Sequence, residues 1–357
     1  MSSKLKPLRS PLGLGARPPS ALAALALLPA LASPSSALAQ STQPVIRISG
    51  SSTVFPITGE AIRRFRQSSA GRDVRFELKE TGTTAGFRAF CAGAVAISNA
   101  SRPINSQELK ACESKGIRFI ELPIAFDALT VAVNPRNSWA REISPAELGR
   151  LWNRRAQGRI KTWNQVNSAW PARPITLCGP DKDSGTFDYF NKAVSGQADN
   201  SRSDYTSSED DNVLVKCVAN DLQALGYFGY SYYAANRNRI RSLAVKGPKG
   251  AVRPSFETVQ KERYLPFSRP LFLYINNEQL LKRPELQRFV TTFVRQGPEI
   301  VKAVGAIPLP ETTYRLVETK LYRHVLGSSF AGDLPVGLTV GQALGRSFQQ
   351  LKRPLPR

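Results

Sequence analysis

The sequence predicts an α/β fold with mostly parallel sheets. Its 357 residues suffice for about two domains whose cores need no metal or partner subunit to fold. Short apolar runs alternate with stretches whose apolar residues recur at helical spacing, and both patterns begin at Val45. Repeated strand-loop-helix units of this kind favour parallel strands, because each helix carries the chain back across the sheet.

Three such units follow one another along the chain. Each is a short apolar strand followed by a helix with one apolar face. The predicted strands and the apolar positions of the helices are residues 45–48 with 57, 61 and 65; residues 74–78 with 87, 90 and 91; and residues 175–177 with 187, 190 and 194. Residues 195–212 carry almost no large apolar side chain and predict a surface loop. Residues 328–357 predict a loosely held tail.

The chain is strongly basic, with 49 Lys and Arg against 27 Asp and Glu and a formal charge of +22. Such a charge suits nucleic acid, a membrane surface or the capture of small anions, and it also arises from solvated faces with no such role. The basic residues are spread along the chain, so composition leaves these alternatives open.

Residues 1–39 predict a secretory signal peptide, with basic positions, an apolar run and Ala37-Leu38-Ala39 before Gln40. No later apolar stretch approaches the roughly 20 residues that span a bilayer. No cysteine follows the apolar run where a lipid could be attached, which favours a bacterium with an outer membrane. We therefore expect a periplasmic protein that starts at Gln40.

Four cysteines lie in the mature region, and an oxidising compartment favours disulfides between them. Three pairings are possible. We favour Cys91 with Cys112 and Cys178 with Cys217, because each pair then stays within one predicted lobe. A metal site is the weaker interpretation, because no CxxC motif or neighbouring His supports it. We expect no cofactor.

Three loops join a predicted strand to a predicted helix and are rich in Gly and hydroxyl residues. They are residues 50–56 (GSSTVFP), 80–86 (ETGTTAG) and 181–186 (DKDSGT). One such loop is ordinary helix capping. Loops at the carboxyl ends of strands in an open sheet face one crevice, and helix N-termini attract anions. Three of them together predict a site for one tetrahedral oxyanion.

Five motifs resemble the periplasmic phosphate-binding proteins of phosphate ABC transporters. In family order they are residues 50–56 (GSSTVFP), 97–103 (ISNASRP), 183–187 (DSGTF), 224–229 (ALGYFG) and 305–310 (GAIPLP). The resemblance runs from about Val45 to Tyr314. It implies a type II periplasmic-binding-protein fold, in which two α/β lobes joined by two crossovers enclose phosphate.

The resemblance also implies a set of ligand contacts. These are Ser52, Thr53, the amides of Val54 and Phe55, Thr83, Ser184, Gly185 and Thr186. The chain departs from the family's best-known members, which have Thr at position 54, Asp at 101 or 102, and an Arg near position 180. We expect Arg102 to supply the missing cation and Asp183 to accept the proton of hydrogenphosphate. A buried carboxylate acceptor would reject sulfate, which has no proton to donate.

We expect lobe one to comprise residues 44–126 and 269–327, lobe two residues 127–268, and the tail residues 328–357. Phosphate would close the lobes by hinge rotation, and the closed form would meet the membrane subunits of an ABC transporter. We expect a monomer that is not an enzyme and binds no nucleic acid.

Other functions remain open on the same residues. They include binding of another oxyanion and a phosphate-sensing or adhesion role. An aspartic-type hydrolase using Asp183, with Glu80 as its partner, is the remote alternative. A serine hydrolase is disfavoured, because His324 is the only histidine and no GxSxG motif occurs. Residues 50–56 lack the GK[ST] ending of a nucleotide P-loop.

Overall fold

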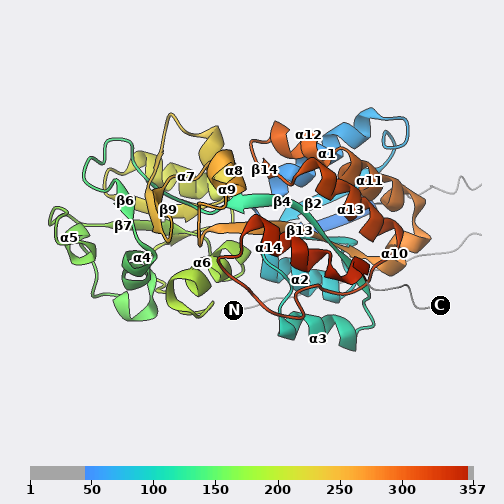
Figure 1. Ribbon diagram of the computed structural model, residues 1–357, viewed down its shortest axis with the longest axis horizontal. Helices are drawn as coiled ribbons and strands as arrows, with labels where there is room; N and C mark the ends of the chain where they lie inside the picture. Colours follow the sequence, from blue (N-terminus) through green and yellow to red (C-terminus); the bar gives the residue numbers. More distant parts are fainter. Residues whose placement is uncertain (1–44, 353–357) are drawn as a thin grey trace, which may run out of the picture. The chain divides into compact units, whose positions relative to one another are not determined.

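A six-stranded sheet carries the first two predicted strand-loop-helix units (Figure 1). The computed structural model describes residues 45–352, so the predicted signal peptide lies outside the described part. The strands, in sheet order, are β14 (Ile307–Pro308), β4 (Phe119–Ala128), β13 (Ser268–Asn276), β3 (Ile97–Ala100), β1 (Val45–Gly50) and β2 (Arg75–Glu80). The helices that follow β1, β2 and β3 are α1 (Phe55–Gln67), α2 (Thr83–Cys91) and α3 (Ser106–Ser114).

A five-stranded sheet carries the third unit. Its strands, in order, are β10 (Arg241–Ser242), β5 (Thr130–Val133), β9 (Ala224–Phe228), β7 (Thr176–Gly179) and β8 (Thr206–Ser207). Helix α6 (Gly185–Ser195) follows β7, and α7 (Asp211–Asn220) follows β8. A third, small sheet consists of β12 (Gly250–Val252), β11 (Ala244–Gly247) and β6 (Glu142–Ile143). The remaining helices of this region are α4 (Pro145–Trp152), α5 (Trp163–Val166), α8 (Tyr230–Ala235) and α9 (Phe256–Gln260).

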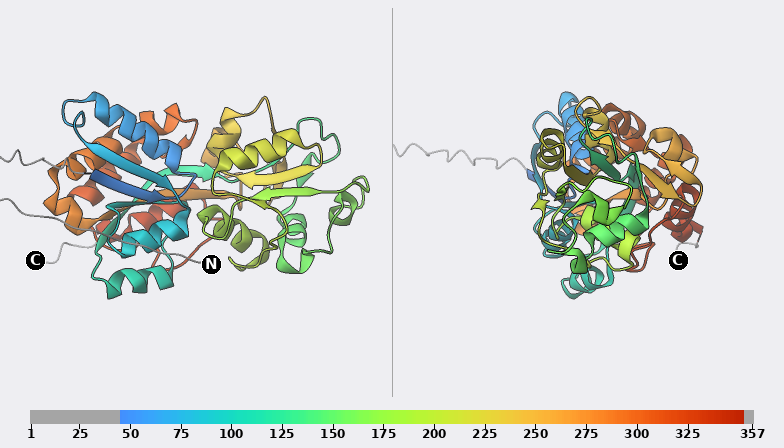
Figure 2. Two further views of the ribbon diagram at one scale, coloured as in Figure 1. Left: turned by 180° about the vertical axis from the view of Figure 1, so that it is seen from behind. Right: turned by 90° about the vertical axis from the view of Figure 1, so that its left-hand side faces the viewer.

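The sheets are mixed rather than mostly parallel. Strand β1 is parallel to β2 and β3, and β7 is parallel to β8 and β9, as the repeated units predict. Strand β13 is antiparallel to both β3 and β4, and β5 is antiparallel to β9. Strands β4 and β13 are buried along their whole length and lie side by side in both Figure 1 and Figure 2. The predicted crossovers fall at the ends of this pair, where Asp127 is the register partner of Arg269.

The chain from residue 328 to 352 is packed, which corrects the prediction of a loosely held tail for this part. Helices α10 (Asn277–Lys282), α11 (Pro284–Arg295), α12 (Gly297–Ala303) and α13 (Glu311–Tyr322) precede it, and it contains α14 (Val340–Ser347). Phe330 and Ala343 are fully buried, and the buried ammonium of Lys320 donates to the carbonyl of Ser347 at 3.1 Å. The sequence interpretation gave weight to the Gly and Pro residues of this segment and missed the helical spacing of Val340, Ala343 and Leu344.

The predicted surface loop at residues 195–212 is largely present. It contains the short exposed strand β8 and ends where α7 begins. The exceptions are Ser201 and Arg202, which are buried, and Asp211, the first residue of α7, which is 1 % exposed. The described residues contain no helix that is both long enough and apolar enough to cross a membrane.

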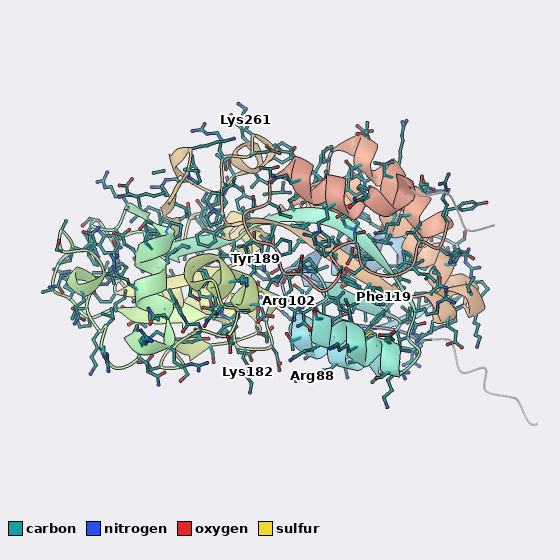
Figure 3. The ribbon with its side chains drawn as sticks, turned by 60° about the horizontal axis from the view of Figure 1, so that its bottom comes forward. Arg88, Arg102, Phe119, Lys182, Tyr189 and Lys261 are labelled. Atoms are coloured by element: carbon teal, nitrogen blue, oxygen red, sulfur yellow. A yellow bond between two sulfur atoms is a disulfide. The ribbon has the colours of Figure 1, made fainter. Side chains whose placement is uncertain are left out.

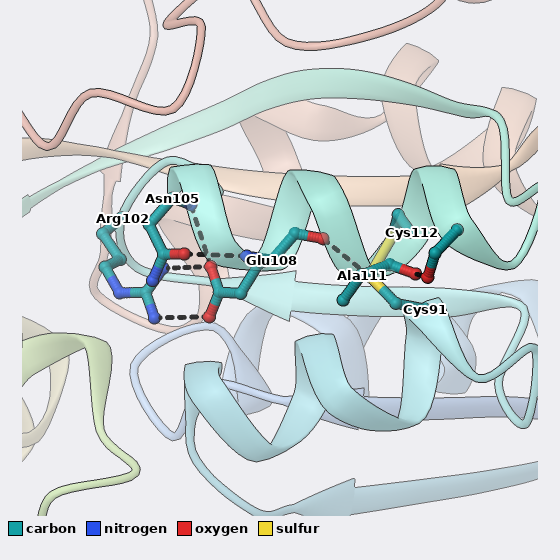
Figure 4. The surroundings of a disulfide bond; sticks show 7 residues. Cys91, Arg102, Asn105, Glu108, Ala111 and Cys112 are labelled. Carbon is teal, nitrogen blue, oxygen red and sulfur yellow. Dashed lines mark hydrogen bonds and ion pairs between the residues drawn. A yellow bond between two sulfur atoms is a disulfide. The ribbon is translucent and has the colours of Figure 1, made fainter.

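Both predicted disulfides are confirmed. Cys91 is bonded to Cys112, which joins α2 to α3 (Figure 4), and Cys178 is bonded to Cys217, which joins β7 to α7. Each bond therefore fixes one helix to a neighbouring helix or strand.

Removing either disulfide should lower the free energy of unfolding. The loops closed span 21 and 39 residues, so loss of chain constraint in the unfolded state predicts about 3 kcal/mol for Cys91→Ser/Cys112→Ser and about 4 kcal/mol for Cys178→Ser/Cys217→Ser. Urea unfolding of the oxidised mature protein and the two variants measures both values. Variants as stable as the parent would contradict a stabilising role.

Candidate functional site

The three predicted loops meet where α1, α2 and α6 begin. The Oγ1 atoms of Thr53 and Thr186 lie 3.2 Å apart, which joins the first loop to the third. The amide of Thr84 donates to the carbonyl of Asp183 at 2.9 Å, which joins the second loop to the third. The N-terminal ends of three helices therefore face one small region, where the helix dipoles favour an anion.

The first loop turns tightly against β3. Gly50 has φ +133°, and a Cβ at this position would lie 2.1 Å from the carbonyl oxygen of Asn99, so only glycine fits. Ser52 and Thr53 are buried beyond this turn, while the Val54 side chain enters the apolar core and leaves only its backbone for a ligand. The Phe55 amide donates to the carbonyl of Ser51 at 3.0 Å, so this predicted contact is engaged within the loop.

Thr83 begins the second helix and is fully buried. Its hydroxyl accepts from the amide of Ser101 at 3.2 Å and lies 3.2 Å from the Ser101 hydroxyl. A Cβ on Gly185 would lie 2.5 Å from the Thr83 hydroxyl, so α6 approaches this position as closely as a glycine allows. Thr83 and Gly185, which belong to different predicted lobes, are thus in direct contact.

Ser184 and Thr186 have different tasks in the third loop. The Ser184 hydroxyl accepts from the Thr186 amide at 3.1 Å and so caps α6. The Thr186 hydroxyl faces the first loop and accepts from Arg269 Nη2 at 2.7 Å. The structure therefore brings together Ser52, Thr53, Thr83, Gly185 and Thr186, and the buried Ser184 hydroxyl caps α6 beside them.

The cation beside these hydroxyls is Arg269, which the sequence analysis placed only at a predicted boundary between the two lobes. Its Nη2 atom donates to Asp127 at 2.9 Å and lies 3.4 Å from the Thr53 hydroxyl, and its Nη1 atom donates to the carbonyl of Gly185 at 2.9 Å. Arg269 is 1 % exposed and Asp127 2 % exposed. An acidic and a basic residue in two mostly apolar strands were the signal that sequence reasoning missed.

Arg102 is fully engaged elsewhere. It makes five hydrogen bonds, to Glu108, Asp188, Thr84 and the carbonyl of Pro103, which equals the donor capacity of a guanidinium. Figure 4 shows its paired contacts with Glu108, and Figure 3 labels Arg102 within the surrounding side chains. These contacts tie α3 to α6, and its predicted role on the ligand stays a prediction.

Asp183 also has a partner outside the three-loop region. Its carboxylate pairs with Arg88 Nη2 at 2.8 Å, and the Arg88 side chain is 63 % exposed. Glu80, its partner in the aspartic-hydrolase alternative, instead lies 3.5 Å from the Tyr232 hydroxyl. The two carboxyls have different neighbours, whereas that chemistry requires a proton shared between them. The predicted role of Asp183 as proton acceptor stays a prediction.

The carboxyl groups of Asp211 and Glu80 lie beside the first loop. Burial and the charge of Glu80 raise the pKa of Asp211 well above its ordinary range, while a hydrogen bond with the Ser52 hydroxyl opposes the rise. Burial and the charge of Asp210 raise the pKa of Glu80 to about 7. The Tyr232 hydroxyl contacts both Glu80 and the carbonyl of Ser52. The raised pKa of Asp211 therefore favours its neutral form over a carboxylate beside this loop.

Comparison with known proteins decides the family. The model of the PBP superfamily domain matches residues 35–296. Protein SphX of Synechocystis sp. is 43 % identical over 303 residues, which are 85 % of this chain and 90 % of the relative. The chain belongs to this family of PstS- and SphX-like binding proteins. The phosphate-binding protein PstS of Staphylococcus aureus is 32 % identical over 267 residues, 74 % of this chain and 79 % of the relative.

Solved structures agree with the type II periplasmic-binding-protein fold. A crystal structure described as a possible phosphate binding protein from Planctomyces limnophilus is 37 % identical, with a TM-score of 0.59, and covers 78 % of this chain and 98 % of its own. An ABC-type phosphate transport receptor from Vibrio cholerae has a TM-score of 0.56 at 18 % identity and covers 73 % and 99 % of the two chains, which shows the fold alone.

Breaking the buried pair at the base of the site should destabilise this PstS- and SphX-like protein. Arg269→Met leaves the Asp127 carboxylate buried without its cation and should lower the free energy of unfolding by about 3–5 kcal/mol. Asp127→Asn/Arg269→Met removes both charges and should recover most of that loss. Urea unfolding of the parent and both variants measures the coupling. Equal destabilisation in the single and double variants would show that the two charges are not coupled.

Proposed function

We propose that this chain captures inorganic phosphate between two lobes and delivers it to the membrane subunits of a phosphate ABC transporter. The observation that carries the proposal is the meeting of three helix N-termini around Thr53, Thr83 and Thr186, with the guanidinium of Arg269 beside them. Donors from separate loops can replace the water shell of one small oxyanion, because each hydrogen bond to it is charge-assisted. The name of the relative from Staphylococcus aureus, a phosphate-binding protein, supports this ligand class.

The proposed contacts differ from the sequence-based set in the cation and the carboxyl, and they omit the Phe55 amide, which is bonded to the carbonyl of Ser51. Arg269 takes the place that we expected for Arg102, because its donors reach the hydroxyls of both Thr53 and Thr186. Asp127 holds Arg269 in place and also accepts from the amide of Tyr230 at 2.9 Å. The other proposed contacts are Ser52, Thr53, the Val54 amide, Thr83, Ser184, Gly185 and Thr186.

Asp211 is the carboxyl that we assign to the ligand. In its neutral form, which the raised pKa favours, this carboxyl would donate a hydrogen bond to an oxyanion, whereas we expected an acceptor at Asp183. The Oδ2 atom of Asp211 has no hydrogen-bond partner among the described residues, so it has capacity for a further bond. The carboxyl and hydrogenphosphate would form one hydrogen bond, and either group can supply its proton.

Lobe closure is the proposed route to transport. The lobes would be residues 44–126 with 269–327 and residues 127–268, and Asp127 and Arg269 would lie at the hinge. The ion pairs Arg102–Asp188 and Arg88–Asp183 join the two lobes at 2.6 and 2.8 Å, so they would form and break with closure. We further propose export to the periplasm, cleavage after Ala39, a monomeric binding protein and no catalytic activity. The charge of +22 would speed the encounter with phosphate.

Removing either threonine hydroxyl should weaken phosphate binding. Thr53→Ala and Thr186→Ala each remove a donor to a charged ligand, which is worth about 1.5–3 kcal/mol, or about 10–100-fold in affinity. Calorimetric titration with phosphate measures the change, and exposed Thr312→Ala is the matched control that should bind like the parent. Heat with sulfate or molybdate but none with phosphate would contradict the proposed ligand.

Phosphate affinity should fall as the pH rises through about 7. Because the pKa of Glu80 is raised to about 7, this carboxyl is mostly neutral below that pH and mostly ionised above it. The new charge beside Ser52 repels the anion, so affinity should fall between pH 6 and 8 by about threefold to tenfold more in the parent than in Glu80→Gln. Titrations at several pH values test this. Parallel pH profiles for the two proteins would exclude Glu80 as the titrating group.

A further inference from the structure

A second basic cavity lies outside the three-loop region. It has a volume of about 290 Å³ and is lined by Pro135, Asn137, Ser138, Arg141, Arg241 and Arg253. Its arginines come from three separate segments, namely the residue before β6, strand β10 and the residue after β12. The fold therefore gathers three guanidinium groups that are distant in sequence around one space.

This cavity is distinct from the proposed phosphate site. Strand β10 pairs with the far end of β5, where Arg241 is the register partner of Val133. Asp127, which holds the cation of the phosphate site, precedes the near end of β5, where Thr130 pairs with Phe228. No residue that lines the cavity is among the proposed phosphate contacts. The inference below is thus independent of the proposed function.

The three arginines have no acidic partner. Among residues 45–352, no carboxylate lies within 4.0 Å of the guanidinium nitrogens of Arg141, Arg241 or Arg253. The nearby Glu142 instead pairs with Lys246 at 2.9 Å. Other buried or half-buried arginines of the described chain, such as Arg102, Arg202 and Arg269, do pair with carboxylates. The positive charge of this cavity is therefore not balanced within the described residues.

Backbone contacts hold two of the arginines in position. Arg241 Nη2 donates to the carbonyls of Asn137 and Ala140, the latter at 2.9 Å. Arg253 Nη1 donates to the carbonyl of Ser242. Each of these guanidiniums has five N–H donors, so both keep donors beyond these contacts. Arg141 is exposed and makes no side-chain hydrogen bond or ion pair within the described residues.

Asn137 adds a buried donor to the same wall. It is 1 % exposed, and its Oδ1 atom accepts from the amide of Ala140 at 3.0 Å. Its Nδ2 atom has no hydrogen-bond partner among the described residues. A buried amide nitrogen without a partner costs free energy that a bound acceptor would recover. Asn137 thus adds a buried donor without an acceptor to the guanidinium donors of the wall.

The arginines also destabilise one another. Burial and the charges of Arg253 and Arg141 lower the pKa of Arg241 below its ordinary value. An anion in the cavity would remove this repulsion. Guanidinium groups bind phosphate oxygens through paired, parallel hydrogen bonds, and their planar geometry suits that group better than a spherical anion.

We propose that this cavity is a second anion site, which binds a compact phosphate-class polyanion with two or more negative charges through Arg141, Arg241, Arg253 and Asn137. Inorganic pyrophosphate represents the class, because its charges can contact all three arginines at once. Phosphate itself would bind here more weakly than in the three-loop region, since it offers fewer oxygens to the separated guanidiniums.

Calorimetric titration with pyrophosphate tests the proposal, with the full mature protein first saturated in phosphate so that the three-loop region is occupied. The parent should bind one pyrophosphate. Arg141→Gln should weaken it at least about fivefold, and Arg141→Gln/Arg253→Gln at least about thirtyfold, because each removes charge-assisted bonds. Arg239→Gln is the matched control, since Arg239 is exposed, lies two residues from Arg241 and does not line the cavity.

The outcomes separate this site from the proposed phosphate site. Weaker pyrophosphate binding in the Arg141 variants, with unchanged phosphate binding, supports the second site. No pyrophosphate binding to the parent overturns it, and so does equal weakening by Arg239→Gln, which would indicate attraction by net charge alone. Because Arg141 has no structural partner, Arg141→Gln tests the proposal even if the double variant fails to fold.

Discussion

The site depends on one buried ion pair, Arg269 with Asp127. The two residues are register partners at the ends of β13 and β4, so sheet pairing itself places the charges together. A lone arginine at this depth would be strongly destabilising, because burial removes its hydration. With Asp127 as its partner, Arg269 can direct its other donors to Thr53, Thr186 and the carbonyl of Gly185. The same pair therefore positions loops from both halves of the chain and supplies the cation between them.

The charged side chains are neutralised to different degrees in three parts of the described chain. Around Ser52, burial raises the pKa of Asp211 well above its ordinary range and the pKa of Glu80 to about 7, so these carboxyls oppose an anion less than carboxyls with ordinary pKa values would. At the rim of α6, Asp183 and Asp188 are paired with Arg88 and Arg102. At the end of the five-stranded sheet, three arginines have no acidic partner within the described residues. The large positive charge of the chain is thus partly concentrated in a defined cavity.

Local sequence signals predicted the local parts of this structure. Glycine and hydroxyl residues between a strand and a helix identified the loops of Ser52, Thr83 and Thr186, because helix capping depends on residues that are adjacent in the sequence. The disulfides followed from keeping each pair within one lobe. Arg269 was missed because its role arises from a partner at position 127, and Asp211 because its burial depends on packing against Ser52. Arg102 was expected on the ligand, since its two carboxylate partners, Glu108 and Asp188, are not visible without the fold.

The most direct test is a crystal structure of the mature protein with arsenate, a phosphate analogue whose arsenic is located by anomalous scattering. We expect the strongest arsenic peak within hydrogen-bond distance of the hydroxyls of Thr53 and Thr186 and the guanidinium of Arg269. The Thr83 and Asp211 side chains should face the same ion. A strongest peak anywhere else, with Thr53, Thr186 and Arg269 still bonded to one another, would contradict an oxyanion site at these helix N-termini.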